Sequence, residues 1–157
     1  MTVMMGCIVF FAFSFMEGPE RVHSSVGAER FVNYVCLGEE GDPQSAGDPE
    51  ALCGYALAHD MLSDDLRESI PYAAFCEEFE LIRERYGPVQ RIEKAGYSRM
   101  RRFNLVRYAY DLWFGDTDAG PDELKVHRLI IELEWVDEGR WVVTNYRLAP
   151  LEQREVR

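Results

Sequence analysis

The side chains best suited to acid–base chemistry lie in the C-terminal half of the chain, where one histidine and three tyrosines stand among apolar residues. They are His127, Tyr108, Tyr110 and Tyr146. A histidine can exchange a proton near neutral pH, and a tyrosine hydroxyl can donate or accept a hydrogen bond. If these side chains share one pocket, they can hold or polarise a small molecule. We therefore take the four residues as pocket candidates.

The alternation of apolar and polar residues indicates which side chains share a face. In NLVRYAYDLWF (104–114) both tyrosines have the parity of the apolar residues, whereas Asp111 has the opposite parity. In KVHRLIIELEWV (125–136) His127 has the apolar parity and Glu132 does not. Because successive side chains of a strand point to opposite faces, we expect no carboxylate base beside the histidine. We therefore assign no catalytic residue.

Metal and cofactor signatures are weak. His59 is followed by Asp60, Asp64 and Asp65, but this set lacks the two-histidine spacing of zinc or iron sites. Ser63 with its two following aspartates is instead typical of a helix N-terminus. The chain carries no phosphate loop and no glycine-rich dinucleotide motif. We expect no metal and no cofactor.

The four cysteines contain no CxxC pair. They are Cys7, Cys36, Cys53 and Cys76, and three of them lie among apolar residues in expected helices. Free thiols are the favoured interpretation, because an unpaired cysteine packs as a small apolar residue. The alternative, a Cys36–Cys53 disulfide, requires an oxidising compartment.

The charge distribution argues against nucleic acid as a partner. The net charge of −11 arises from residues 1–90, since residues 91–157 carry equal numbers of acidic and basic side chains. A phosphate backbone requires a basic face. The one basic stretch, RIEKAGYSRMRR (91–102), is expected to be mainly a solvated strand face. Its Arg99 and Arg101, together with Trp113, are the candidates for a protein-interaction surface.

Periodicity predicts helices followed by strands. Apolar residues recur at helical spacing, then switch to strict alternation after Gly87. Three expected helices cover 28–38, 49–62 and 72–87, with a short capped piece at 63–70. The expected strands cover 88–102, 104–114, 125–136 and 140–150, the first irregular near Gly96. The sequence therefore predicts an α+β fold, with N-terminal helices packed on a curved four-stranded antiparallel sheet.

Three motifs add a resemblance. AHDMLSDDLRES, FCEEFELIRERYGPVQRIEKAGY and EGRWVVTNYRLAP, in this order, resemble the NTF2-like (cystatin-like) superfamily over residues 28–149. They are most similar to uncharacterised small bacterial domains of exported or lipoprotein type. The resemblance implies a cone-shaped domain with a cavity, and homodimers formed through the sheet. We expect a non-catalytic module that binds a small apolar ligand or a protein, with an isomerase- or dehydratase-like enzyme as the alternative.

The N-terminus sets the expected domain boundaries. Residues 1–16 carry no charge, 17–27 form an expected linker, 28–150 the domain and 151–157 a tail. Sixteen helical residues span only about 24 Å, less than a hydrocarbon core of about 30 Å. Three interpretations of residues 1–16 stay open: an export or anchor segment, a short signal-anchor, or an apolar helix packed on the domain. Association with a membrane through residues 1–16, or export, is slightly favoured over a cytoplasmic location.

Overall fold

The structure, a computed structural model, describes residues 19–39, 53–99, 104–118, 120, 122–136 and 139–151. Within these residues four helices precede four strands, which confirms the predicted α+β class. The elements are α2 (Pro19–Leu37), α3 (Gly54–Asp60), α4 (Asp64–Ser69), α5 (Tyr72–Tyr86), β1 (Val89–Arg99), β2 (Leu105–Phe114), β3 (Lys125–Val136) and β4 (Arg140–Pro150).

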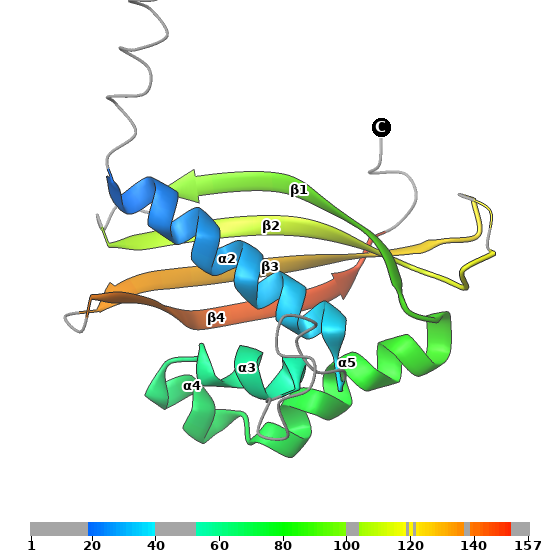
Figure 1. Cartoon of the computed structure of the whole chain (residues 1–157), viewed down its shortest axis with the longest axis horizontal. Coiled ribbons are helices and arrows are strands. Elements are labelled where there is room, and N and C mark those ends of the chain that lie inside the picture. Colours follow the sequence, from blue (N-terminus) through cyan, green and yellow to red (C-terminus); the bar gives the residue numbers. More distant parts are fainter. Residues whose placement is uncertain are drawn as a thin grey trace, which may run out of the picture.

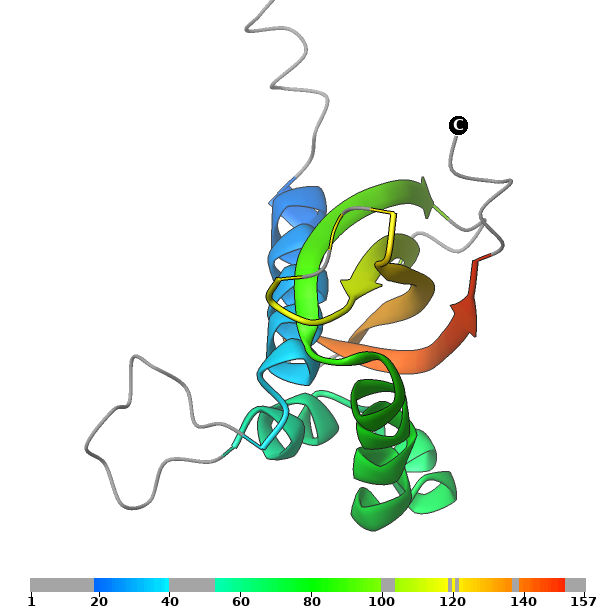
Figure 2. The same ribbon diagram turned by 90° about the vertical axis from the view of Figure 1, so that its right-hand side faces the viewer.

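The strands form one antiparallel sheet in the order β1-β2-β3-β4. Helix α2 crosses one face of this sheet diagonally, and α3, α4 and α5 gather beside β4 (Figure 1). The sheet is strongly curved when seen along its strands (Figure 2). Each strand follows its neighbour in sequence, so short hairpins are enough to form the sheet.

Aromatic side chains join the helices to the sheet. Phe75 of α5 lies at the centre of this cluster, with its ring centroid 6.3 Å from Phe31 of α2 and 6.3 Å from Tyr55 of α3. It also packs against Phe79 at 5.2 Å and Tyr146 of β4 at 5.7 Å. One residue of α5 thus contacts rings on two other helices and on the sheet, and edge-to-face contacts of this kind add to the stabilisation from apolar burial.

Helix α2 begins earlier than the sequence indicated. Residues 19–27, expected to belong to a linker, form its first half, so the expected boundary at residue 28 is wrong. Pro19 occupies the first turn, where a missing N–H costs nothing. Ser24 is fully buried, and its hydroxyl lies 2.9 Å from the Tyr108 hydroxyl. The first turns of α2 are thus held against the sheet by a residue 84 positions away in the sequence, which a local sequence pattern does not reveal.

The turn and cap predictions are confirmed. Ser63 caps α4, because its hydroxyl accepts a hydrogen bond from the Leu66 N–H. Gly87 ends α5 with φ 91°, and Gly139 closes the β3–β4 hairpin with φ 75°. The expected irregularity near Gly96 is present as a register shift in the β1–β2 pairing. Helix α3 begins at Gly54, and residues 49–52 of the expected helix lie outside the described residues.

Candidate functional site

Two of the four pocket candidates are held by hydrogen bonds inside the core. The Tyr108 hydroxyl lies 2.9 Å from the Ser24 hydroxyl. The Tyr146 hydroxyl donates to a Glu78 carboxylate oxygen at 2.7 Å. Burial, followed by this carboxylate, raises the pKa of Tyr146 well above its ordinary value. Both hydroxyls therefore link helices to the sheet, and neither is arranged to donate a proton to a ligand.

The other two candidates are buried without such partners. No hydrogen-bond partner for the Tyr110 hydroxyl is found among the described residues, and burial raises its pKa well above the ordinary value. His127 packs between Tyr86 and Phe114, with ring centroids 5.4 Å and 5.3 Å away. Its Nδ1 likewise has no partner within the described part of the chain, and the ring lines a small cavity of about 140 Å³.

The strand register separates these four residues. His127 lies opposite Leu112 and Pro150, whereas Tyr146 lies opposite Ile131. Tyr108 is on the far side of that same Ile131, so β3 lies between the two tyrosines. The predicted parity was right, since all four side chains are on the helix-facing side. Their surroundings nevertheless differ, and the four side chains do not line one common pocket.

Burial of His127 predicts a pH dependence of stability. Burial lowers the pKa of His127 below 6.5, so the unfolded chain binds a proton more readily than the folded protein. We expect the free energy of unfolding to fall as pH drops below about 6.5, by at most about 1.4 kcal/mol per pH unit from this group. His127→Phe should flatten that slope in urea denaturation series between pH 7.5 and 5.5. Tyr110→Phe is the control and should keep the slope, and an unchanged slope in His127→Phe would contradict the assignment.

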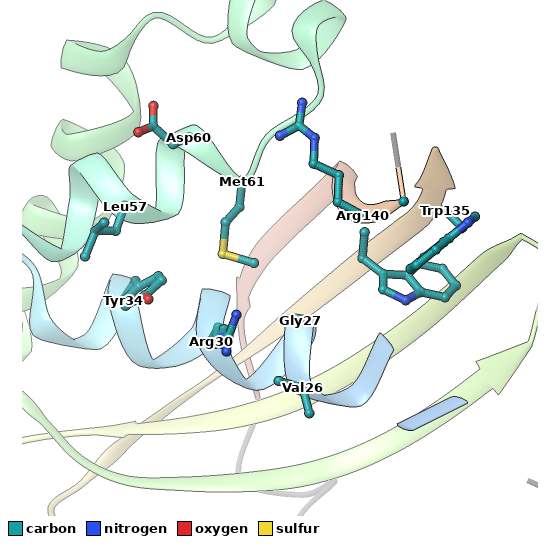
Figure 3. Close-up of a pocket in the computed structure, with 11 residues that line it drawn as sticks. Val26, Gly27, Arg30, Tyr34, Leu57, Asp60, Met61, Trp135 and Arg140 are labelled. Carbon is teal, nitrogen blue, oxygen red and sulfur yellow. The ribbon is translucent and has the colours of Figure 1, made fainter. Parts of the chain in front are cut away.

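A larger depression lies between α2, α3 and the β3–β4 hairpin (Figure 3). We call it the hairpin groove; its volume is about 700 Å³. Its walls are mainly apolar, and three charged residues lie among them. The described lining residues are Val26, Gly27, Arg30, Tyr34, Leu57, Asp60, Met61, Trp135, Gly139, Arg140 and Trp141.

Two indole rings form the sheet side of the hairpin groove. Trp135 and Trp141 face each other across the hairpin in an edge-to-face contact, with ring centroids 5.3 Å apart. Trp135 is 37% exposed, which is unusual for so large an apolar side chain. The Trp141 Nε1 is buried, and no described residue accepts its hydrogen bond. Helix α2 passes close to Trp141 at Gly27. A Cβ at this position would lie 3.5 Å from the Trp141 Cβ, an ordinary contact distance.

Charge at the groove is predominantly positive. Arg30 of α2 and Arg140 of β4 are exposed lining residues, as is Asp60 of α3. Two guanidinium groups and one carboxylate give the lining a net charge of +1, although the whole chain carries −11. The sequence analysis missed this site because its walls come from three separated segments. The one available signal was the Trp pair flanking the hairpin.

The two interaction-surface candidates that the structure describes, Trp113 and Arg99, lie far apart along the β1–β2 pair. Trp113 is half-buried under the Arg91 guanidinium, 4.1 Å from its ring centroid. Arg99 lies at the other end of the same strand pair, opposite Val106. Arg101 lies outside the described residues. Trp113 is therefore part of a local cation–π contact on the sheet surface.

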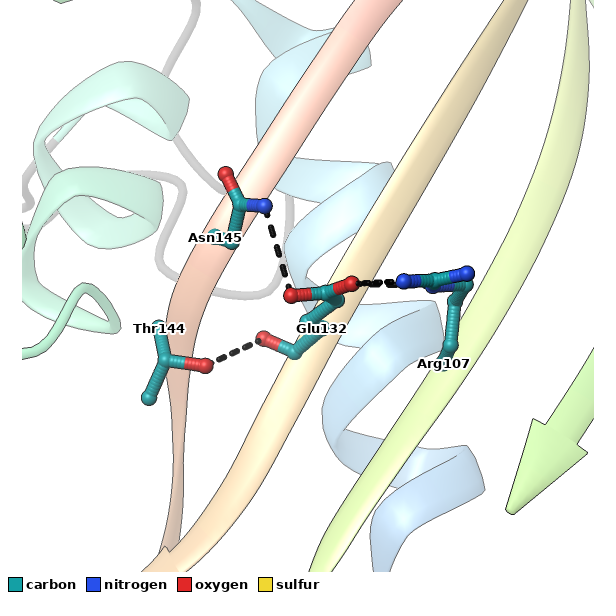
Figure 4. A network of polar contacts seen from close by, with 4 residues as sticks. All are labelled: Arg107, Glu132, Thr144 and Asn145. Atoms are coloured by element: carbon teal, nitrogen blue, oxygen red, sulfur yellow. Dashed lines mark hydrogen bonds and ion pairs between the residues drawn. The ribbon is translucent and has the colours of Figure 1, made fainter. Parts of the chain in front are cut away.

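The outer sheet face carries cross-strand charge pairs. The Arg107 guanidinium binds Glu132, which also accepts a hydrogen bond from Asn145 (Figure 4). Arg128 forms a two-point contact with Asp111, at 2.8 Å and 3.0 Å. Both pairs join neighbouring strands, and Asp111 of the second pair is buried, at 8% exposure.

Comparisons with protein-family models, with curated proteins and with solved structures each found no significant match. The NTF2-like resemblance accordingly stays a prediction. The described residues contain no group of three potential metal ligands, and no described helix has the length and apolarity to cross a membrane. Residues 1–16, for which an export or anchor segment, a signal-anchor and a packed helix stay open, lie outside the described residues.

Proposed function

We propose that this protein is a non-catalytic binding module whose hairpin groove takes a small apolar or aromatic molecule that carries an anionic group. The observation that carries this proposal is the Trp135–Trp141 pair, in which one ring is partly exposed and the other has a buried N–H that no described residue accepts. A buried donor lacking an acceptor is costly, and a ligand oxygen would remove that cost.

The composition of the groove supports this ligand class. Leu57, Met61 and the two indoles offer apolar contacts, and methionine adapts to ligands of irregular shape. Arg30 and Arg140 supply positive charge for a carboxylate or sulfonate. A volume of about 700 Å³ lies within the range of small-molecule sites.

Binding is favoured over catalysis because of the side chains that line the groove. Its described lining includes one carboxylate, Asp60, which is exposed, and no histidine. A general base needs a pKa tuned by its surroundings and a position close to the proton it removes. The buried His127 lines a separate, much smaller cavity. An isomerase- or dehydratase-like reaction therefore has less support than binding.

The test is a titration of the full chain with 8-anilinonaphthalene-1-sulfonate, an aromatic probe with one negative charge. We expect saturable binding that Trp135→Ala weakens by about tenfold or more, since aromatic residues dominate binding sites. Arg30→Gln should weaken this probe but not an uncharged naphthalene analogue.

Trp113→Ala is the matched control, because it also removes one tryptophan but acts on the outer sheet face. Its affinity for the probe should equal that of the unmodified chain. If Trp113→Ala and Trp135→Ala weaken the probe equally, the probe binds elsewhere and the groove proposal is wrong.

A further inference from the structure

Two cysteine thiols meet at one tyrosine hydroxyl on the helical side of the molecule. Cys53 directly precedes α3, and its Sγ lies 3.3 Å from the Tyr72 hydroxyl oxygen. Cys76 follows Tyr72 by one turn on the same face of α5, and its thiol interacts with the same hydroxyl. The two thiols thus share one neighbouring hydroxyl, although they come from different segments of the chain.

All three described cysteines are partly exposed, and the third, Cys36, is distinguished by a large shift of its pKa. Cys53 and Cys76 are half-buried, and the intervening Tyr72 is 43% exposed. Cys36 lies inside the helix packing, where burial raises the pKa of its thiol to about 12. Because the thiolate is the reactive form, this large shift suits Cys36 to packing rather than to oxidation. Burial also raises the pKa of the Cys76 thiol, but there the Tyr72 hydroxyl acts in the opposite direction.

We propose that Cys53 and Cys76 are a site of oxidative modification, at which the two thiols close into an intramolecular disulfide. Tyr72 is 43% exposed, so its side chain can rotate toward solvent and release both thiols. The sequence had instead suggested Cys36 as the partner of Cys53, and the packing now favours Cys76.

The oxidant is a small disulfide such as oxidised glutathione. One protein thiolate attacks a glutathione sulfur, forming a mixed disulfide and releasing one glutathione thiolate. The second protein thiolate then attacks the protein sulfur of the mixed disulfide and releases the second glutathione. The protein loses two protons and two electrons, and oxidised glutathione is reduced to two glutathione molecules.

The bond would tie the start of α3 to the second turn of α5 and enclose α3 and α4 in a covalent ring. A ring of this size restricts the unfolded chain, so the oxidised protein is expected to melt at a higher temperature. The same bond would restrain α3, which supplies Leu57 and Met61 to the hairpin groove.

The experiment treats the full chain, carrying Cys7→Ser to remove a competing thiol, with oxidised glutathione. Peptide mapping by mass spectrometry should find one cross-link between the peptides of Cys53 and Cys76. Titratable thiols should fall from three to one, and the melting temperature should rise and return on addition of dithiothreitol. Tyr72→Phe removes the hydroxyl that binds both thiols and should speed cross-linking several-fold.

Three variants serve as controls. Cys53→Ser and Cys76→Ser should each give only a mixed disulfide with glutathione and no internal cross-link. Cys36→Ser should cross-link as the parent does. Mixed disulfides alone in the parent chain, or a cross-link that includes Cys36, would overturn the proposal. Neither result bears on ligand binding in the groove, which the probe titration tests separately.

Discussion

Replacing Phe75 with alanine is expected to lower the free energy of unfolding by about 3–5 kcal/mol, the usual cost of truncating a fully buried phenylalanine. Phe75 is 0% exposed and packs against rings from α2, α3, α5 and β4. Its removal leaves a cavity where α2, α3, α5 and β4 meet. Urea denaturation followed by circular dichroism measures the change.

Leu81→Ala is the matched control for this experiment. Leu81 lies on the same helix but is 57% exposed, and leucine and alanine have similar helix propensities. We expect a change within about 0.5 kcal/mol. Comparable losses in the two variants would show that α5 does not present Phe75 to the core.

Replacing Gly54 with alanine is expected to destabilise the fold by about 1–3 kcal/mol, because the added methyl group has no room. A Cβ on Gly54 would lie 2.3 Å from the Tyr34 carbonyl oxygen and 2.7 Å from the Leu37 Cβ. Both atoms belong to the last turns of α2, so α2 and α3 must separate or tilt. Thermal and urea denaturation both report this loss.

Gly96→Ala provides the comparison for a glycine with open surroundings. A Cβ there would lie 3.9 Å from the Ala109 Cβ, which is an ordinary contact, and φ of Gly96 is not positive. Alanine also restricts the unfolded chain, so the variant should be neutral or slightly more stable. If Gly54→Ala is equally well tolerated, the close contact between α2 and α3 is wrong.

Local chemistry fixed the elements of this fold. Alternation placed Tyr108, Tyr110 and His127 on the helix-facing side of the sheet, because side-chain direction in a strand depends only on parity. The Ser63 cap and the end of α5 at Gly87 were also predictable. Ser63 accepts a hydrogen bond from a backbone N–H three residues away, and Gly87 adopts the positive φ that ends a helix. The fold class followed from the order of these elements.

Contacts between distant segments were not predictable in this way. The sequence of residues 19–27 predicted a linker. In the structure this segment is helical, and the Ser24 hydroxyl contacts that of Tyr108. The four pocket candidates share a face but not a pocket, because each packs against helix residues that parity does not specify.

The sequence by itself determined an acidic α+β chain, the strand faces and the helix ends, since these depend on residues close together along the chain. Only the tertiary structure decided where Trp135 and Trp141 meet α2 and α3, and how Tyr72 joins Cys53 to Cys76. Both arrangements depend on the angles and spacing at which helices pack on a curved sheet. Those quantities are set by the packing of the whole core, and no single segment encodes them.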